Sequence, residues 1–231
     1  MAGMRRLMVV ALALTVVAGG CGKEAVPDEP VAFGAAPPVS SQLEITAPAG
    51  DVVPAASWPS ACKFLTDEEL KAVLPQATDI KRVPQGVSIV SISDKSQTSV
   101  APEGSCSYKF GLEGAAAEEF ISSLIVTIDA VADPELIEEH YTETRTSESK
   151  RDDRKQFENQ SDLGPDDCYS WLYATSEFHL VCRQGPMMFE VRGNGSGSFT
   201  GVNDTDLTAR ARVWLEKAQA PAAKIIAAKV P

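Results

Sequence analysis

The sequence predicts an α+β domain in which an antiparallel β-sheet of about six strands has helices packed on one face. Three observations support this class. Short apolar segments with strand-like patterns recur from residue 87 to residue 193, and capped amphipathic helices precede, interrupt and follow them. Turn-forming residues separate the last three of these segments.

The first helix is the most strongly specified element. Thr66 is followed three residues later by Glu69, which is the spacing of a capping box, and Leu65 and Leu70 are placed to form the hydrophobic staple beside it. Pro75 then ends the helix. We therefore expect the folded domain to open with a short helix just after Cys62.

Two more helices are expected further along the chain. Asp133 caps the second, with Pro134 at its first position. Its inner face comprises Leu136, Ile137, His140, Tyr141 and Thr144. Residues 143–156 are nearly all charged or small polar, so we interpret them as a solvated helix end and loop rather than as a docking surface. Asn203 or Asp204 caps the last helix, which Pro221 ends or kinks.

Six segments have strand patterns. They cover residues 87–93, 105–112, 121–129, 167–175, 178–184 and 187–193. The second alternates cleanly and places Cys106, Tyr108, Phe110 and Leu112 on one face. A turn near Ser176 and the pair Gly185-Pro186 join the last three into an antiparallel meander.

The N-terminal region indicates export. Arg5 and Arg6 precede a short apolar run and then small residues up to Cys21, which is the layout of a secretory signal peptide over residues 1–20. Cys21 stands where a lipoprotein signal peptidase would leave a lipidated N-terminus, although Ala18 occupies a position that usually holds Leu. Ordinary cleavage, which leaves an unlipidated Cys21, is the alternative.

Three regions follow from this interpretation. After the leader, residues 21–57 are rich in Pro, Ala, Gly and Ser without an apolar period, so we expect a lipidated cysteine and a tether. Residues 58–231 form a single α+β domain. The predicted localisation is extracytoplasmic, with the domain anchored to the cell membrane through the lipid on Cys21.

The charge of the chain excludes one class of partner. Removing the leader takes away Arg5 and Arg6 and changes the formal net charge from −11 to −13. Such an acidic domain is repelled by phosphate backbones, so no nucleic acid is expected as a partner.

Four cysteines besides Cys21 indicate disulfides, since an even count in an exported chain favours pairing. Three connectivities are possible. If a turn near residue 175 closes the first hairpin of the meander, Cys168 falls opposite Cys182, which leaves Cys62 with Cys106. Zinc is the rival interpretation, but the chain has no CxxC pair and its two histidines are far apart, so no metal is expected.

We find no catalytic motif. The chain lacks GxSxG, HExxH, a P-loop and a dinucleotide-binding glycine motif, so neither an enzyme nor a cofactor is expected. His140 and His179 are the two candidates for a catalytic base. His140 lies on the inner face of a helix, where a core histidine is the commoner explanation. His179 should share its strand face with Val181 and Arg183.

Several segments together resemble a family. They are ACKFLTDEELKAVLP, CSYKF, LGPDDCYSW and FHLVCRQGPMMFEV. Over residues 58–218 the chain resembles a family of exported actinobacterial lipoproteins known mainly as a domain of unknown function. Its members share a Cys-x-Leu-Thr helix start, a Cys-Ser-Tyr or Cys-Ser-Trp strand, a Gly-Asp-type turn and an Arg-x-Gly strand end. The resemblance implies a surface-anchored, non-enzymatic protein, and Cys168 and Cys182 are additions to its pattern.

The expected function is that of a lipid-anchored binding or accessory domain of the bacterial cell envelope. Its ligand would be a small molecule, a glycan or an envelope protein, held against a sheet with several aromatic residues. They are Tyr108, Phe110, Tyr169, Trp171 and Tyr173. The alternatives are a hydrolase that acts on envelope polymers with acidic residues, and a structural partner of a secreted complex.

Overall fold

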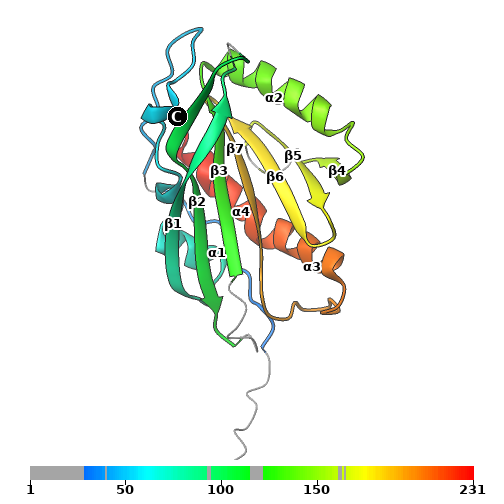
Figure 1. Ribbon diagram of the computed structural model, residues 1–231. Helices are drawn as coiled ribbons and strands as arrows, with labels where there is room; N and C mark the ends of the chain where they lie inside the picture. The colour runs from blue at the N-terminus through cyan, green and yellow to red at the C-terminus, as the bar shows by residue number, and fades with distance from the viewer. Residues whose placement is uncertain (1–28, 40, 93–94, 115–121, 161–162, 164) are drawn as a thin grey trace, which may run out of the picture.

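The computed structural model describes residues 29–39, 41–92, 95–114, 122–160, 163 and 165–231 (Figure 1). In that part of the chain, seven strands form one antiparallel sheet in the order β1-β2-β3-β7-β6-β5-β4. The strands are β1 (Ala77–Val90), β2 (Thr98–Leu112), β3 (Ser122–Val131), β4 (Lys155–Asn159), β5 (Asp167–Tyr173), β6 (Glu177–Gln184) and β7 (Met187–Asn194). The helices are α1 (Asp67–Val73), α2 (Pro134–Glu148), α3 (Leu207–Trp214) and α4 (Ala220–Lys229), with the short turns η1 (Ala55–Ser57), η2 (Ala61–Lys63) and η3 (Leu215–Gln219). The α+β class predicted from the sequence is confirmed.

The described sheet has one strand more than expected. β4 begins in the last two residues of the charged stretch that we interpreted as helix end and loop, extends beyond it, and pairs with β5 at the edge of the sheet. Phe157 packs against the core on this strand, whereas Lys155, Gln156 and Glu158 are exposed. A single inward residue gives no alternation that a sequence pattern could reveal.

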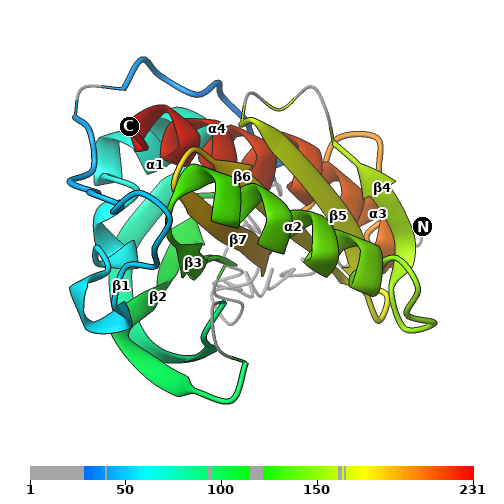
Figure 2. The same cartoon turned by 90° about the horizontal axis from the view of Figure 1, so that it is seen from above.

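The helices cover both faces of the sheet, so the expectation of helices on one face is wrong. α1, α3 and α4 lie on one face, and α2 lies on the other (Figure 2). The reason is that both faces of the meander are apolar. Phe178 and Leu180 point towards the face covered by α3 and α4, while Val181 packs in the smaller cluster beneath α2.

The first helix has the predicted capping box. The Thr66 hydroxyl accepts a hydrogen bond from the Glu69 amide at 3.2 Å, and the Glu69 carboxylate accepts one from the Thr66 amide at 2.8 Å. Beside it, the buried Tyr108 hydroxyl of β2 donates to the Ala61 carbonyl at 2.6 Å and accepts from the Leu65 amide at 3.2 Å. Burial raises the pKa of Tyr108 to about 12. These bonds fix α1 and η2 onto β2.

Pro221 does not end the last helix, which begins at an Asp206 cap rather than at Asn203 or Asp204 as expected. Pro221 has no amide hydrogen to donate, and the chain passes through the π-helical turn η3 immediately before it. Gln219 in this turn is buried and donates to the carbonyls of Phe178 at 3.0 Å and Gly193 at 3.3 Å. The turn therefore ties the C-terminal helices to β6 and β7.

The expected tether is packed on the domain over the residues that the structure describes. Val31 is only 5 % exposed, its amide donates to the Ser198 carbonyl, and Leu43 donates to the Lys229 carbonyl. Val52 forms an isolated β-bridge with Ala132. The segment has almost no regular structure, as its composition indicates, yet scattered apolar side chains hold it against the core. The leader, Cys21 and residues 22–28 lie outside the described residues. Among the described helices, none is long and apolar enough to span a bilayer.

Candidate functional site

Both predicted disulfides are present. Cys62 of η2 is bonded to Cys106 of β2, and Cys168 of β5 is bonded to Cys182 of β6. Cys168 and Cys182 are directly opposite in the register, as the hairpin argument required. Cys106, Cys168 and Cys182 are fully buried, and all four cysteines are paired, so we assign them a structural role.

The predicted aromatic surface does not exist as one face. Tyr108 and Phe110 are buried beneath α1 and the C-terminal helices, whereas Tyr169 and Trp171 belong to the cluster under α2. Tyr173 is 53 % exposed at the end of β5. The aromatic residues of each strand are two positions apart and so share a face, but those of β2 face α1 and the C-terminal helices whereas Tyr169 and Trp171 of β5 face α2.

Both histidines line a single cavity of about 440 Å³ on the α2 face of the sheet. Its walls come from α2, the end of β1, and strands β3, β5, β6 and β7. His140 is half-buried and faces this cavity, so the core interpretation of that residue is wrong. Burial lowers the pKa of His140. His179 shares its face with Val181, as predicted.

His179 is held by an aromatic ring and by carboxylates. Its ring stacks on Trp171, with centroids 4.8 Å apart. Nδ1 lies 3.2 Å from Glu190 Oε1, and Nε2 lies 3.6 Å from Glu177 Oε1. Arg192 links the same two carboxylates at 3.2 Å each. Arg192 and the two carboxylates therefore each have an opposite charge beside them.

Asp129 also lines this cavity. It is the extra residue of a β-bulge, since Ile128 pairs with Phe189 and Ala130 pairs with Met188. The bulge places a half-buried carboxylate in the cavity wall, and in the described part of the chain it has no hydrogen bond or ion pair. Burial and the nearby Glu190 carboxylate raise the pKa of Asp129 well above its usual range. Sequence analysis missed this residue because the shift of register at residue 129 depends on the pairing with β7.

Three other buried polar atoms of the cavity lining have no hydrogen-bond partner among the described residues, namely the Tyr169 hydroxyl, Trp171 Nε1 and His179 Nδ1. Tyr169 is fully buried, and its hydroxyl has no partner among the described residues. Its ring stacks on Phe157 at 5.3 Å and on Trp171 at 5.7 Å, which fixes its position. Burial, followed by the negative charge of Asp129, raises the pKa of Tyr169, so its hydroxyl stays protonated. Buried polar groups without partners are uncommon in folded proteins and call for an explanation.

One side of the cavity is closed by an ion pair. Arg154 is hydrogen-bonded to Glu148 at the end of α2, and its guanidinium lies over the Trp171 ring, 5.1 Å from the centroid. Both side chains are largely buried. The cavity therefore has paired charges on its rim and an unpaired carboxylate with a protonated phenol inside.

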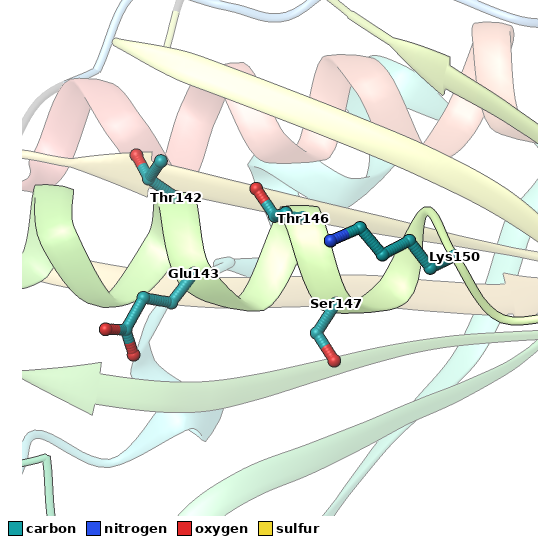
Figure 3. A pocket seen from close by; sticks show the side chains of 5 residues that line it. All are labelled: Thr142, Glu143, Thr146, Ser147 and Lys150. Carbon is teal, nitrogen blue, oxygen red and sulfur yellow. The ribbon is translucent and has the colours of Figure 1, made fainter.

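A second hollow has none of these features. It is an open depression on the outer surface of α2, and Figure 3 shows its five side chains on that helix and just beyond it. Thr142 and Thr146 point to one side, and Glu143 and Ser147 point to the other. All five residues, including Lys150, are exposed. We regard this depression as ordinary helix surface.

The arrangement in the cavity suits a ligand that carries a positive charge. An ammonium group placed at Asp129 would provide the missing donor to its carboxylate. In the described part of the chain, no group of three or more histidine, cysteine or acidic side chains is arranged to hold a metal ion. No family model, no curated protein and no solved structure matches this chain.

Proposed function

We propose that this chain is a non-catalytic binding domain that holds a small organic cation in the cavity between α2 and the sheet, outside a bacterial cell membrane. The observation that carries the proposal is Asp129, a half-buried and unpaired carboxylate at a β-bulge. A partly desolvated carboxylate without a partner destabilises the protein, and a bound cation removes that penalty. The unpartnered Tyr169 hydroxyl in the same cavity supports the assignment.

Asp129→Asn is expected to weaken the binding of a simple amine such as n-butylammonium. The loss of a charge-assisted hydrogen bond corresponds to about 1.5–3 kcal/mol, or on the order of ten- to a hundredfold in Kd. Titration followed by nuclear magnetic resonance measures the Kd and shows which residues respond. Asp152→Asn is the matched control, because it removes the same charge from an exposed position. Equal affinity in the wild type and in Asp129→Asn would contradict the proposal.

Measuring the free energy of unfolding of Asp129→Asn and of the wild type as a function of pH would establish that the variant is folded. It would also test the raised pKa of Asp129. The folded protein keeps the Asp129 proton at pH values where the unfolded chain has released it, so stability is lost as the pH rises above the ordinary aspartate pKa of about 3.9. Asparagine does not titrate. The variant should therefore be more stable than the wild type at neutral pH, by about 1.4 kcal/mol for each unit of the upward shift, and the two should converge at acid pH.

Asp129 and its neighbour Glu190 also favour one alternative function, that of a hydrolase of envelope polymers. Two neighbouring carboxylates with different environments, Asp129 and Glu190, are the usual requirement for acid–base cleavage of glycans. Release of soluble fragments from envelope glycan, abolished by both Asp129→Asn and Glu190→Gln, would favour the hydrolase over the binding domain.

Export and anchoring complete the proposal. The two disulfides indicate an oxidising compartment, which agrees with an exported domain. Lipid on Cys21 would attach this domain to the membrane, and Cys21→Ala should release the protein or leave an uncleaved precursor. Fractionation of cells and medium measures this. If the variant is processed and fractionates like the wild type, the anchor is wrong.

A further inference from the structure

A second, more apolar cavity of about 320 Å³ adjoins the proposed cation site. It lies between residues 52–58 and the far end of the β1–β2 hairpin, where residues 89–92 meet residues 97–100. Its apolar lining includes Val52, Trp58, Ile89, Val90 and Val100.

The wall formed by residues 52–58 is fixed in place. Val52 bridges to Ala132, and the Val53 amide donates to the Val131 carbonyl at 3.0 Å. The Trp58 indole N–H donates to the Val53 carbonyl at 2.9 Å, which holds its ring at the cavity. This cavity is therefore formed before any ligand arrives.

The two cavities share part of their lining. Asp129, Ile89 and Val90 line both. The unpaired carboxylate thus stands at the boundary, with the polar, histidine-containing cavity on one side and the apolar cavity on the other. Any molecule that fills both must pass this carboxylate.

The apolar cavity also leaves hydrophobic surface uncovered. Val90 is 54 % exposed and Val100 is 56 % exposed, and these two are among the few large hydrophobic residues of the described chain with such exposure. An alkyl chain placed against them would remove apolar surface from water on both molecules.

We propose that the two cavities together bind one single-chain amphiphile, with its cationic amine at Asp129 and its alkyl chain against Val90, Val100 and Trp58. This inference rests on the proposed cation site and adds the class of ligand. The charge at the boundary selects the head group, and the adjoining apolar cavity selects the tail. A small polar cation would leave the second cavity empty, whereas a neutral lipid would leave Asp129 unpaired.

The test compares n-alkylamines from butyl to decyl with the corresponding n-alkanols, below the concentrations at which they aggregate. The protein used in the test begins at residue 22, so it keeps every described residue and both disulfides. It lacks Cys21, carries no lipid and is therefore studied without detergent. Each methylene that enters the apolar cavity should lower the Kd of an amine about fourfold, which is the ratio that about 0.8 kcal/mol per buried CH₂ gives. The gain should stop once the cavity is full.

Two variants separate the contribution of the amine head group to binding from that of the alkyl chain. Asp129→Asn should remove the preference for amines over alkanols while keeping the dependence on chain length. The double variant Val90→Ser and Val100→Ser should flatten that dependence and should still prefer amines over alkanols of the same length, because Asp129 is intact. Val83→Ser is the matched control, since Val83 is an exposed β1 residue that lines neither cavity.

The outcomes distinguish the two proposals. If butylamine binds through Asp129 but longer amines bind no tighter, the cation site stands and the amphiphile is wrong. If chain length matters equally in the double variant, the tail lies elsewhere and the assignment of the second cavity is wrong. If no amine of any length binds, both proposals fail.

Discussion

Replacing Lys229 with methionine is expected to destabilise the protein by about 3–5 kcal/mol, because it would leave the Glu69 carboxylate buried without its cation. Lys229 is 1 % exposed, and its ammonium donates to Glu69 Oε2 at 2.6 Å and to the Phe64 carbonyl at 3.0 Å. Glu69 is itself buried and is part of the capping box of α1. One substitution at the end of α4 therefore removes a charge pair and weakens a helix cap far away in sequence.

Denaturant unfolding under non-reducing conditions measures the change. Lys224→Met is the control, since Lys224 belongs to the same helix and is exposed. The double variant Lys229→Met with Glu69→Gln should recover part of the loss, because a neutral amide oxygen can still accept from the Thr66 amide. If Lys229→Met is no more destabilising than Lys224→Met, the buried ion pair contributes nothing to stability.

Removing the Cys62–Cys106 disulfide is the second large effect, with an expected loss of about 4 kcal/mol, against about 3 kcal/mol for Cys168–Cys182. The first bridge closes a separation of 44 residues and the second closes one of 14, so the first restricts the unfolded chain more. It also joins η2, at the entrance to α1, to strand β2.

Paired alanine substitutions at each bridge, unfolded by urea, give the comparison. The single substitutions are avoided because they leave one free thiol that can form mixed disulfides. A greater loss on removing Cys168–Cys182 would show that the chain-entropy argument does not govern these bridges. The packing of the two fully buried cysteines in the sheet would then be the larger contribution.

Local sequence patterns were sufficient for most of the fold. The Thr66–Glu69 spacing, the cap at Asp133 and the alternation around Cys106 each depend on residues close together in the chain, and each was found as predicted. The hairpin between β5 and β6 fixed the register by its turn, and this placed Cys168 opposite Cys182. Short-range geometry determines such features, so a sequence carries them without help from the rest of the protein.

The candidate site depends on contacts between distant segments. His140 and His179 showed no relation in sequence, and they line one cavity because α2 packs on the face of the sheet opposite to the other helices. Asp129 lies in an apolar strand pattern, and the bulge that exposes its carboxylate to the cavity arises from the pairing of β3 with β7. No periodicity within β3 marks that shift.

The buried ion pair of Glu69 and Lys229, which are far apart in sequence, shows the same contrast between local patterns and long-range contacts. Glu69 was recognisable as a capping residue from four consecutive positions, whereas its partner Lys229 is 160 residues away and looks like an ordinary helix-end lysine. A cap requires neighbours along the chain, but a buried ion pair, a bulge and a cavity require that several elements already be packed together. Local preferences therefore decided the helices and strands, and long-range packing decided which polar groups became buried, paired or left free to bind.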